Sequence, residues 1–219
     1  MRTLGIVDSV GLPRPTVGCY YETTYISKLE KKGYFWLLSG GGYRLATRYE
    51  HLLNLSQYLE PNFFDLIVIQ IGIVDCSPRP IPYLVRQVVS LGPSWLIKGV
   101  AQVLHILRPI ILKKKFYQFT PIKKFTLLYG NLLKVTKRLG KTTIIIGIAP
   151  IKHSLEIHSP GTTTQIDLYN NSLKELAKTS DSYYVDLEGL SEEDLTDDAH
   201  IKGTAHTFIL DRIEEILKR

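Results

Sequence analysis

Three residues of this 219-residue chain could together perform nucleophilic catalysis. Ser9 follows a short apolar run near the amino terminus, whereas Asp197 and His200 stand three residues apart near the carboxyl terminus. A serine hydroxyl is a weak nucleophile until an imidazole accepts its proton, and a carboxylate holds that imidazole in the required tautomer. The spacing lets Asp197 curl back to Nδ1 of His200 and leaves Nε2 for Ser9. The sequence therefore contains a candidate Ser9–His200–Asp197 triad.

The triad can form only in a fold that brings the two ends of the chain together. Five runs rich in branched and aromatic residues are predicted to be strands, namely Thr3–Asp8, Tyr34–Ser39, Leu66–Gly72, Thr142–Ala149 and Tyr183–Leu187. Helical patterns cover Thr23–Lys32, Tyr43–Leu59, a long region from about Tyr83 to Lys115, Ile122–Leu139, Gln165–Lys178 and Gly203–Lys218. Strands that alternate with helices indicate a parallel sheet with crossover helices.

Two of the predicted strands are apolar at consecutive positions, which is typical of strands covered on both faces. These are Leu66–Gly72 and Thr142–Ala149. The sequence therefore predicts an α/β fold, a three-layer α/β/α sandwich around a five-stranded parallel sheet, with residues 1–219 forming a single domain. Ligands of such sheets bind at the carboxyl ends of the strands. Ser9 and the Asp197–His200 segment are both expected at that edge.

The motifs resemble those of the SGNH or GDSL-like hydrolases, whose fold is flavodoxin-like. Asp8-Ser9 is similar to the family's Gly-Asp-Ser motif, Gly72–Asp75 to its Gly-x-Asn-Asp motif, and Asp197–His200 to its Asp-x-x-His motif. The run Gly40–Gly42 stands where the family has an oxyanion glycine. The resemblance implies catalysis by Ser9, His200 and Asp197, with oxyanion donors from the N–H groups of Ser9 and of Gly41 or Gly42. The segments DSVGLPR and GIVDCSPRP resemble a subgroup associated with bacterial surface-polysaccharide biosynthesis.

The chain departs from the family pattern at two positions. Val7 replaces the glycine of Gly-Asp-Ser, and Val74 replaces the asparagine that would donate a side-chain hydrogen bond to the oxyanion. Losing one such donor typically costs about 10²- to 10³-fold in rate. Other polar side chains near the predicted edge could contact substrate, and three of them could replace the donor. The candidate substrate-binding residues are Arg14, Arg44, Asp75 and Arg79.

The positive charge of the chain is concentrated in one segment. No Asp or Glu occurs between Cys76 and Leu155, although 14 of the 27 basic residues lie there. This segment includes an insertion at about residues 78–125 that a minimal five-stranded hydrolase would not need. One interpretation is a helical cap whose Lys113, Lys114 and Lys115 complement the helix dipole. The other is a lid that attracts an anionic glycan, a lipid-linked intermediate or an anionic membrane surface. Nucleic acid is not expected, because it would leave the triad unexplained.

Other classes of function are disfavoured by what the chain lacks. Two cysteines cannot build a disulfide framework, and no spacing of the six histidines indicates a metal site. No metal or cofactor is predicted. The first residues lack the apolar stretch of a signal peptide, and charged residues interrupt the most apolar helical region. A cytoplasmic protein, in solution or peripheral to the membrane, is therefore expected.

These observations together favour a serine esterase that removes O-acyl groups from a carbohydrate. O-acetyl groups of a bacterial surface polysaccharide, or of its precursor, are the expected substrate. An O-acyltransferase would use the same triad and the same first half-reaction. A module that binds or assembles glycans without catalysis, having lost the asparagine at position 74, is the remaining alternative. The sequence does not determine the oligomeric state.

Overall fold

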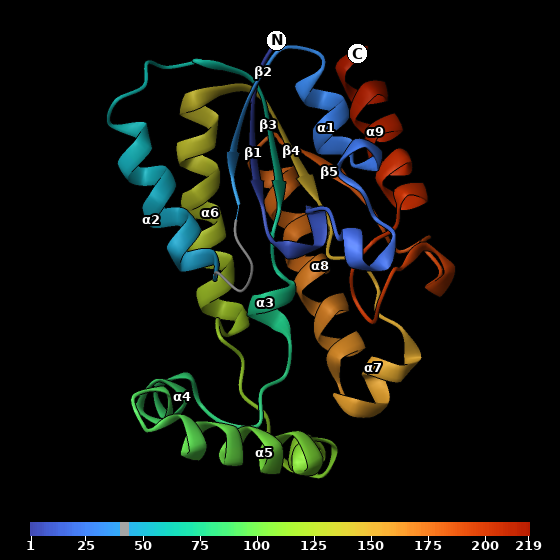
Figure 1. Cartoon of the computed structure of the whole chain (residues 1–219). Helices are drawn as coiled ribbons and strands as arrows, with labels where there is room; N and C mark the ends of the chain where they lie inside the picture. Colours follow the sequence, from blue (N-terminus) through green and yellow to red (C-terminus); the bar gives the residue numbers. More distant parts are fainter. Residues whose placement is uncertain (40–43) are drawn as a thin grey trace.

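The computed structural model describes residues 1–39 and 44–219 of the chain. Its five strands are β1 (Arg2–Val7), β2 (Tyr34–Leu38), β3 (Phe64–Gln70), β4 (Gly140–Ile146) and β5 (Tyr183–Val185). All pairings between these strands are parallel, in the order β2-β1-β3-β4-β5. This order is that of the flavodoxin-like doubly wound sheets. The α/β/α class and the five-stranded parallel sheet predicted from the sequence are therefore confirmed (Figure 1).

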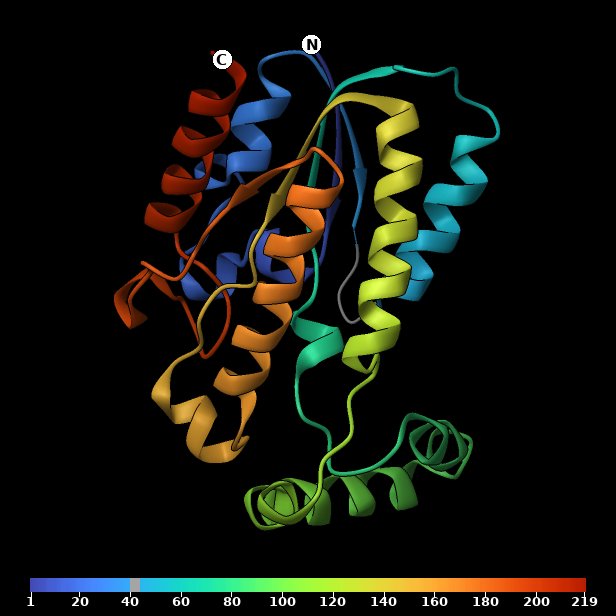
Figure 2. The ribbon, with the colours of Figure 1, turned by 180° about the vertical axis from the view of Figure 1, so that it is seen from behind.

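The helices cover the sheet on both sides (Figures 1 and 2). One face carries α2 (Leu45–Ser56), α6 (Ile122–Leu139) and α8 (Thr162–Thr179), and the other carries α1 (Tyr25–Glu30) and α9 (Gly203–Leu217). Shorter elements are α3 (Ile73–Cys76), α7 (His153–His158), and the 3-10 turns η1 (Ser9–Gly11), η2 (Pro15–Val17), η3 (Tyr21–Thr23) and η4 (Glu192–Asp194). The insertion contains α4 (Tyr83–Ser90) and α5 (Ser94–Lys114).

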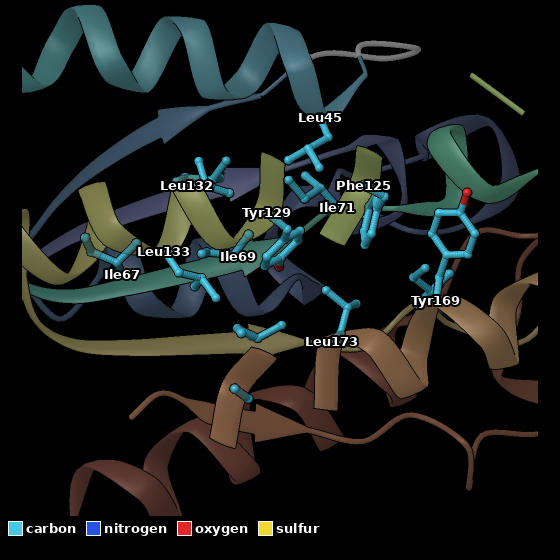
Figure 3. Close-up of a cluster of buried hydrophobic side chains, with 14 of the residues drawn as sticks. Leu45, Ile67, Ile69, Ile71, Phe125, Tyr129, Leu132, Leu133, Tyr169 and Leu173 are labelled. Atoms are coloured by element: carbon cyan, nitrogen blue, oxygen red, sulfur yellow. The ribbon is translucent and has the colours of Figure 1, made fainter. Parts of the chain in front are cut away.

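The apolar runs of the central strands explain why the sheet is buried on both faces. Side chains alternate across a strand, so consecutive apolar residues supply both layers. Ile67 and Ile69 of β3 pack with α2, α6 and α8, whereas Leu66 and Val68 pack toward α1 and α9. Figure 3 shows the first of these cores, in which Phe125, Tyr129 and Tyr169 and several leucines fill the space above the strands. The two cores fix the sheet as a rigid support for the loops at its edge.

Glycine at position 72 is required where β3 turns into α3. Its φ angle is +147°, in the region that favours glycine, and a Cβ there would lie 2.7 Å from Cδ1 of Ile148. The chain can therefore turn sharply at the carboxyl end of β3 only because no side chain is present. This turn places α3 directly after the carboxyl end of β3 (Figure 1).

The long helical region predicted from Tyr83 to Lys115 consists of two helices. The chain leaves the helical path at Leu91–Pro93, where Pro93 precedes the first residue of α5. A residue before proline is disfavoured in the helical region, which ends α4 at this point. The pair of α4 and α5 lies beyond α3, at the carboxyl edge of the sheet, and is set apart from the sandwich in both views (Figures 1 and 2).

Candidate active site

Ser9, His200 and Asp197 lie together at the carboxyl edge of the sheet. Oγ of Ser9 is 3.2 Å from Nε2 of His200, and Nδ1 of the same ring is 2.8 and 2.9 Å from the two carboxylate oxygens of Asp197. Ser9 is half-buried, and the side chain of His200 keeps 17% of its exposure. The distances are those of a nucleophile, a general base and an orienting carboxylate. All three residues are partly exposed to solvent.

Ser9 is positioned by the carboxylate of the residue before it. Asp8 caps η1, since its Oδ1 accepts a hydrogen bond from the N–H of Val10 at 3.0 Å, and its Oδ2 accepts one from the N–H of Gly72 at 3.3 Å. The carboxylate thereby joins the turn after β1 to the turn after β3. Sequence reasoning used Asp8 as part of a motif but missed this bridging role. The apolar run that leads into Asp8 was a sign of its burial.

Burial changes the proton affinity of Asp8. Loss of hydration raises the pKa of Asp8 from 3.8 to about 6, although the hydrogen bonds from Val10 and Gly72 act in the opposite direction. The negative charge of Asp75 adds to the upward shift. Asp8 therefore takes up a proton in mildly acidic solution, at a point one residue from the candidate nucleophile.

The loop that carries Asp197 and His200 is held by its own hydrogen bonds. Oδ1 of Asp197 accepts from the N–H groups of Ala199 and His200 at 3.0 and 2.9 Å, in addition to the ring contact. The N–H and Oγ1 of Thr196 both donate to the carbonyl of His200, at 2.6 and 3.0 Å. Leu195 and Ile201 form an antiparallel bridge at the base of the loop. The short spacing thus produces a closed turn in which the imidazole has one orientation.

Asp197 remains ionised under ordinary conditions. Burial acts to raise the pKa of Asp197, but hydrogen bonds from Ala199 and from the ring and N–H of His200 outweigh it and hold the pKa below its ordinary value. An ionised carboxylate accepts the Nδ1–H of His200. Nε2 of the neutral ring then has its lone pair directed toward Ser9, as a general base requires.

Arg14 also reaches this ring. Its Nη2 is 2.5 Å from Nε2 of His200, and its backbone pairs with Cys19 across the turn that contains η2. The fold therefore brings Arg14 to the triad, and its contact with substrate stays a prediction. Its guanidinium lies beside the nitrogen that would deliver a proton to a leaving group.

The expected oxyanion donors are only partly described. Ser9 is the first residue of η1, and the N–H of a first helical residue has no acceptor within its own turn. Gly41 and Gly42 lie within residues 40–43, outside the described residues. Val74 is in the short helix α3 with 9% of its surface exposed, and it places an apolar side chain where the resemblance implies an amide donor.

Asp75 differs from the prediction that it contacts substrate. Its carboxylate is 1% exposed and accepts hydrogen bonds from the N–H of Leu45, at 3.2 and 3.0 Å, and from Oγ1 of Thr120. Burial raises the pKa of Asp75 to about 6 against the opposing effect of these bonds. A substrate could reach this carboxylate only by displacing those partners. Asp75 instead ties α3 to the start of α2 and to the segment before α6.

The two remaining arginine candidates lie near Asp75. Arg44 precedes α2, is half-buried and acts electrostatically on Asp75, as Arg79 also does. The backbone of Arg79 pairs with Tyr117, and its guanidinium lies over the ring of Phe119, 4.6 Å from the centroid. Arg79 therefore faces the inserted helices, whereas Arg14 faces His200.

Comparisons with known proteins place the fold. No family model and no curated protein matches the chain. Among solved structures it is similar to a member of the lipolytic protein G-D-S-L family from Veillonella parvula DSM 2008, with a TM-score of 0.64 and 10% identity over 100% of this chain and 99% of that one. A carbohydrate acetylesterase family member from Sinorhizobium meliloti matches with a TM-score of 0.60 and 16% identity, over 100% and 98% of the chains.

A third structure supports the same placement. The lipase/acylhydrolase from Enterococcus faecalis matches with a TM-score of 0.59 and 12% identity, over 100% of this chain and 96% of the other. Each likeness extends over the whole sheet and its helices rather than over a single motif. The chain has the fold of the G-D-S-L, or SGNH, hydrolases.

Proposed function

We propose that the protein is a serine esterase that removes O-acyl groups from a carbohydrate. The observation that carries this proposal is the contact of Oγ of Ser9 with Nε2 of His200, together with the double contact of Nδ1 with Asp197. A hydrogen-bonded nucleophile, base and orienting carboxylate at the ligand-binding edge of a parallel sheet can perform acyl transfer.

In the first half of the reaction Ser9 becomes acylated. Oγ attacks the acyl carbonyl carbon while its proton passes to Nε2 of His200, and Asp197 stabilises the imidazolium that results. The carbonyl oxygen carries negative charge in the tetrahedral intermediate and needs N–H donors such as that of Ser9. The intermediate collapses when the bond to the sugar oxygen breaks. That oxygen leaves as a hydroxyl with the proton from Nε2.

In the second half water restores the enzyme. Nε2 of His200 accepts a proton from water as the water oxygen attacks the acyl carbon. The ester bond to Oγ of Ser9 then breaks, Oγ takes the proton back from Nε2, and the carboxylic acid is released. A sugar hydroxyl in place of water would give an O-acyltransferase by the same steps. Hydrolysis and transfer therefore differ only in which hydroxyl reaches the acyl-enzyme.

The choice of an acetylated carbohydrate rests on the solved structures that resemble the chain. One is described as a carbohydrate acetylesterase family member, and another, with a TM-score of 0.57 and 16% identity over 99% of both chains, as an acetyl xylan esterase, AlAXEase. Acetyl groups on a bacterial surface polysaccharide or its precursor are the substrate that we propose. A cytoplasmic site of action is part of the proposal, and both cysteines are free, as a reducing compartment would leave them.

A non-catalytic glycan-binding module is the second candidate, and one observation favours it. Val74 provides no polar group to an oxyanion, so stabilisation of the transition state would depend on backbone donors. Such a module would keep the triad geometry at the carboxyl edge of the sheet but would not hydrolyse an ester. The two candidates differ in whether Ser9 reacts.

An organophosphonate that esterifies active serines separates the candidates. We expect mass spectrometry to find one adduct, on Ser9, in the wild-type chain and none in Ser9→Ala. Release of acetate from an acetylated polysaccharide should fall to background in Ser9→Ala and in His200→Ala. The double variant should be little slower than either, because residues of a triad act as a unit. Absence of labelling in a folded chain would favour the binding module. Acetate release that survives Ser9→Ala would instead overturn the assignment of Ser9 as the nucleophile.

A further inference from the structure

The insertion is attached to the sandwich through a narrow connection. Its two connecting segments pair where the N–H of Arg79 donates to the carbonyl of Tyr117 at 2.7 Å and the N–H of Tyr117 donates back at 2.9 Å. Two side-chain contacts then tie α5 to the end of α7. Nη2 of Arg108 donates to Oγ of Ser159 at 3.0 Å, and the rings of His105 and His158 meet at 3.2 Å.

A pocket of about 450 Å³ lies between the inserted helices and this connection. Three guanidinium groups line it, from Arg79 of the connection, Arg86 of α4 and Arg108 of α5. Arg79 and Arg86 both lie over the ring of Phe119, with guanidinium carbons 4.6 and 5.4 Å from its centroid. The three arginines come from separate elements and converge on one cavity. We call this cavity the arginine pocket.

The positive charge in the arginine pocket is poorly balanced. None of the described residues that line it is an Asp or Glu. Burial, followed by the charges of Arg108 and Arg86, lowers the pKa of Arg79 to about 10, and the opposing effect of Asp75 is smaller. The buried Nε atoms of Arg79 and Arg108 also have no hydrogen-bond partner in the described part of the chain. The cationic side chains of the arginine pocket therefore have no carboxylate partner among the described lining residues.

The remaining walls of the arginine pocket are apolar. Ile97, Val100 and Leu104 follow one another at three- and four-residue spacing, and so they share the face of α5 that lines the cavity. Phe119 closes the end beside the arginines. A ligand that fills this space therefore meets cationic donors at one end and aliphatic carbon along its length.

We propose that the arginine pocket binds a phosphate-class anion that is attached to an apolar chain. Planar guanidinium groups match phosphate oxygens in pairs, and a phosphate monoester with a charge near −2 balances three cations better than a single carboxylate does. The chain of the ligand lies along α5. The site is separate from the triad and needs no chemistry at Ser9, so it goes beyond the esterase proposal.

The position of the arginine pocket would place a bound ligand near the candidate active site. The inserted helices lie beyond α3, at the carboxyl edge of the sheet (Figure 1). Ser9, in the turn directly after β1, and His200, which contacts it, lie at the same edge. A molecule held by its phosphate and chain in the arginine pocket would present any attached group near that edge. The same ligand chemistry occurs in a phospholipid headgroup of a bilayer and in a single amphiphilic phosphate ester, and the experiment below distinguishes these two sources.

Calorimetry with hexyl phosphate, inorganic phosphate and neutral hexyl glucoside tests the site itself. We expect hexyl phosphate to bind at least about tenfold more tightly than inorganic phosphate, because part of its chain leaves water. Hexyl glucoside should not bind measurably. Arg86→Gln should lower the affinity for hexyl phosphate by about tenfold or more. Arg86 is exposed on α4, and so the substitution should leave the fold intact.

Two further variants distinguish binding in the arginine pocket from general attraction to the positive charge of the insertion. Lys98→Gln removes the same charge from an exposed position of α5 outside the pocket lining and should change affinity by less than about twofold. Ala101→Phe narrows the pocket without changing its charge. It should weaken the binding of hexyl phosphate more than the binding of inorganic phosphate. No binding of hexyl phosphate, or equal losses in Arg86→Gln and Lys98→Gln, would overturn the proposal. Equal affinities for hexyl phosphate and inorganic phosphate would do the same.

Vesicles identify the source of the ligand. Phosphatidylcholine vesicles with and without 30% phosphatidic acid, about one lipid in three, are mixed with the chain and sedimented. Sedimentation that requires phosphatidic acid and is lost in Arg86→Gln assigns the site to a bilayer headgroup. Binding of hexyl phosphate without such sedimentation assigns it to a single amphiphile. Sedimentation that Arg86→Gln and Lys98→Gln reduce equally would show charge attraction alone, and would count against the pocket.

Discussion

Nη2 of Arg14 lies 2.5 Å from Nε2 of His200, the same ring nitrogen that Oγ of Ser9 approaches at 3.2 Å. A neutral imidazole whose Nδ1–H is donated to Asp197 has a single lone pair at Nε2. Arg14 and the Ser9 hydroxyl therefore compete for one acceptor. Once Nε2 has taken a proton it is itself a donor, and the Arg14 contact cannot persist. Arg14 must move during the reaction, and a substrate group with an oxygen acceptor would draw it away.

Removal of this competition should accelerate a substrate that has no group for Arg14. A competing hydrogen bond with a net value of about 1 kcal/mol corresponds to about fivefold in rate. We expect Arg14→Ala to raise kcat on p-nitrophenyl acetate by about that factor, whereas Arg212→Ala, which removes an exposed cation from α9, should not change it. Initial rates at pH 7.5, a value chosen as about one unit above the ordinary histidine pKa, provide the measurement. A fall of more than tenfold would instead mean that Arg14 donates to the transition state.

Val74 allows a test of the missing oxyanion donor. Val74→Asn should raise kcat on a small activated ester by at least about tenfold, because one such donor is typically worth about 10² to 10³ in rate. Val74→Leu is the control, since it has a similar size and no N–H. The site is only 9% exposed, so an unpaired amide would cost about 1 to 3 kcal/mol of stability, which thermal unfolding would detect. Unchanged turnover in a folded Val74→Asn chain would mean that the oxyanion does not face α3.

Asp8 should make the protein less stable as the pH rises through mildly acidic values. Because burial raises the pKa of Asp8 to about 6, the folded chain keeps a proton between about pH 4 and pH 6 that the unfolded chain has lost. The free energy of unfolding therefore falls over this interval, by up to about 3 kcal/mol from this group. Asp8→Asn should flatten that part of the curve, measured by urea unfolding. Below about pH 4, where Asp8 is protonated in both states, the variant should be less stable than the wild type by about 1 kcal/mol, because the Gly72 N–H loses its acceptor.

His206 should act in the opposite direction. Its ring is fully buried against Tyr25, with both ring nitrogens unpartnered within the described part of the chain, and burial lowers the pKa of His206 to about 4. The unfolded chain then binds a proton that the folded chain refuses between about pH 6.5 and pH 4. Stability should fall by up to about 3 kcal/mol as the pH decreases through this range. His206→Leu should abolish that loss in the same urea series. An unchanged acid limb would show that His206 opens to water.

The central strands were predictable because their consecutive apolar residues indicate burial on both faces. β3 and β4 overlap the predicted runs, although each begins two residues earlier, and the order of the motifs placed Ser9 and His200 at one edge. Shorter elements could not be predicted. α7 has six residues, and its sequence HSLEIH has too few turns to show a helical period. The break between α4 and α5 did have a sign in Gly92-Pro93.

The contacts of the candidate site were harder to predict, because they depend on the direction in which each side chain points. Asp75 occupies a motif position at the expected edge, but the turn of α3 directs its carboxylate inward to Leu45 and Thr120. The contact of Arg14 with His200 joins residues 186 positions apart, and no local pattern encodes it. The three cations of the arginine pocket are spread from position 79 to position 108, on a connection and two helices. Composition indicated a basic segment, whereas the meeting of these groups depends on tertiary packing.

The paired backbones of Arg79 and Tyr117 have a consequence for how such a chain can diverge. The insertion leaves and rejoins the sandwich at adjacent points, so residues between them can be lengthened, shortened or exchanged while the path of every strand stays the same. Ser9 and His200 lie outside that interval, on loops anchored by Asp8 and Asp197. Mutations in the insertion can therefore change which ligand this protein binds without changing the reaction at Ser9.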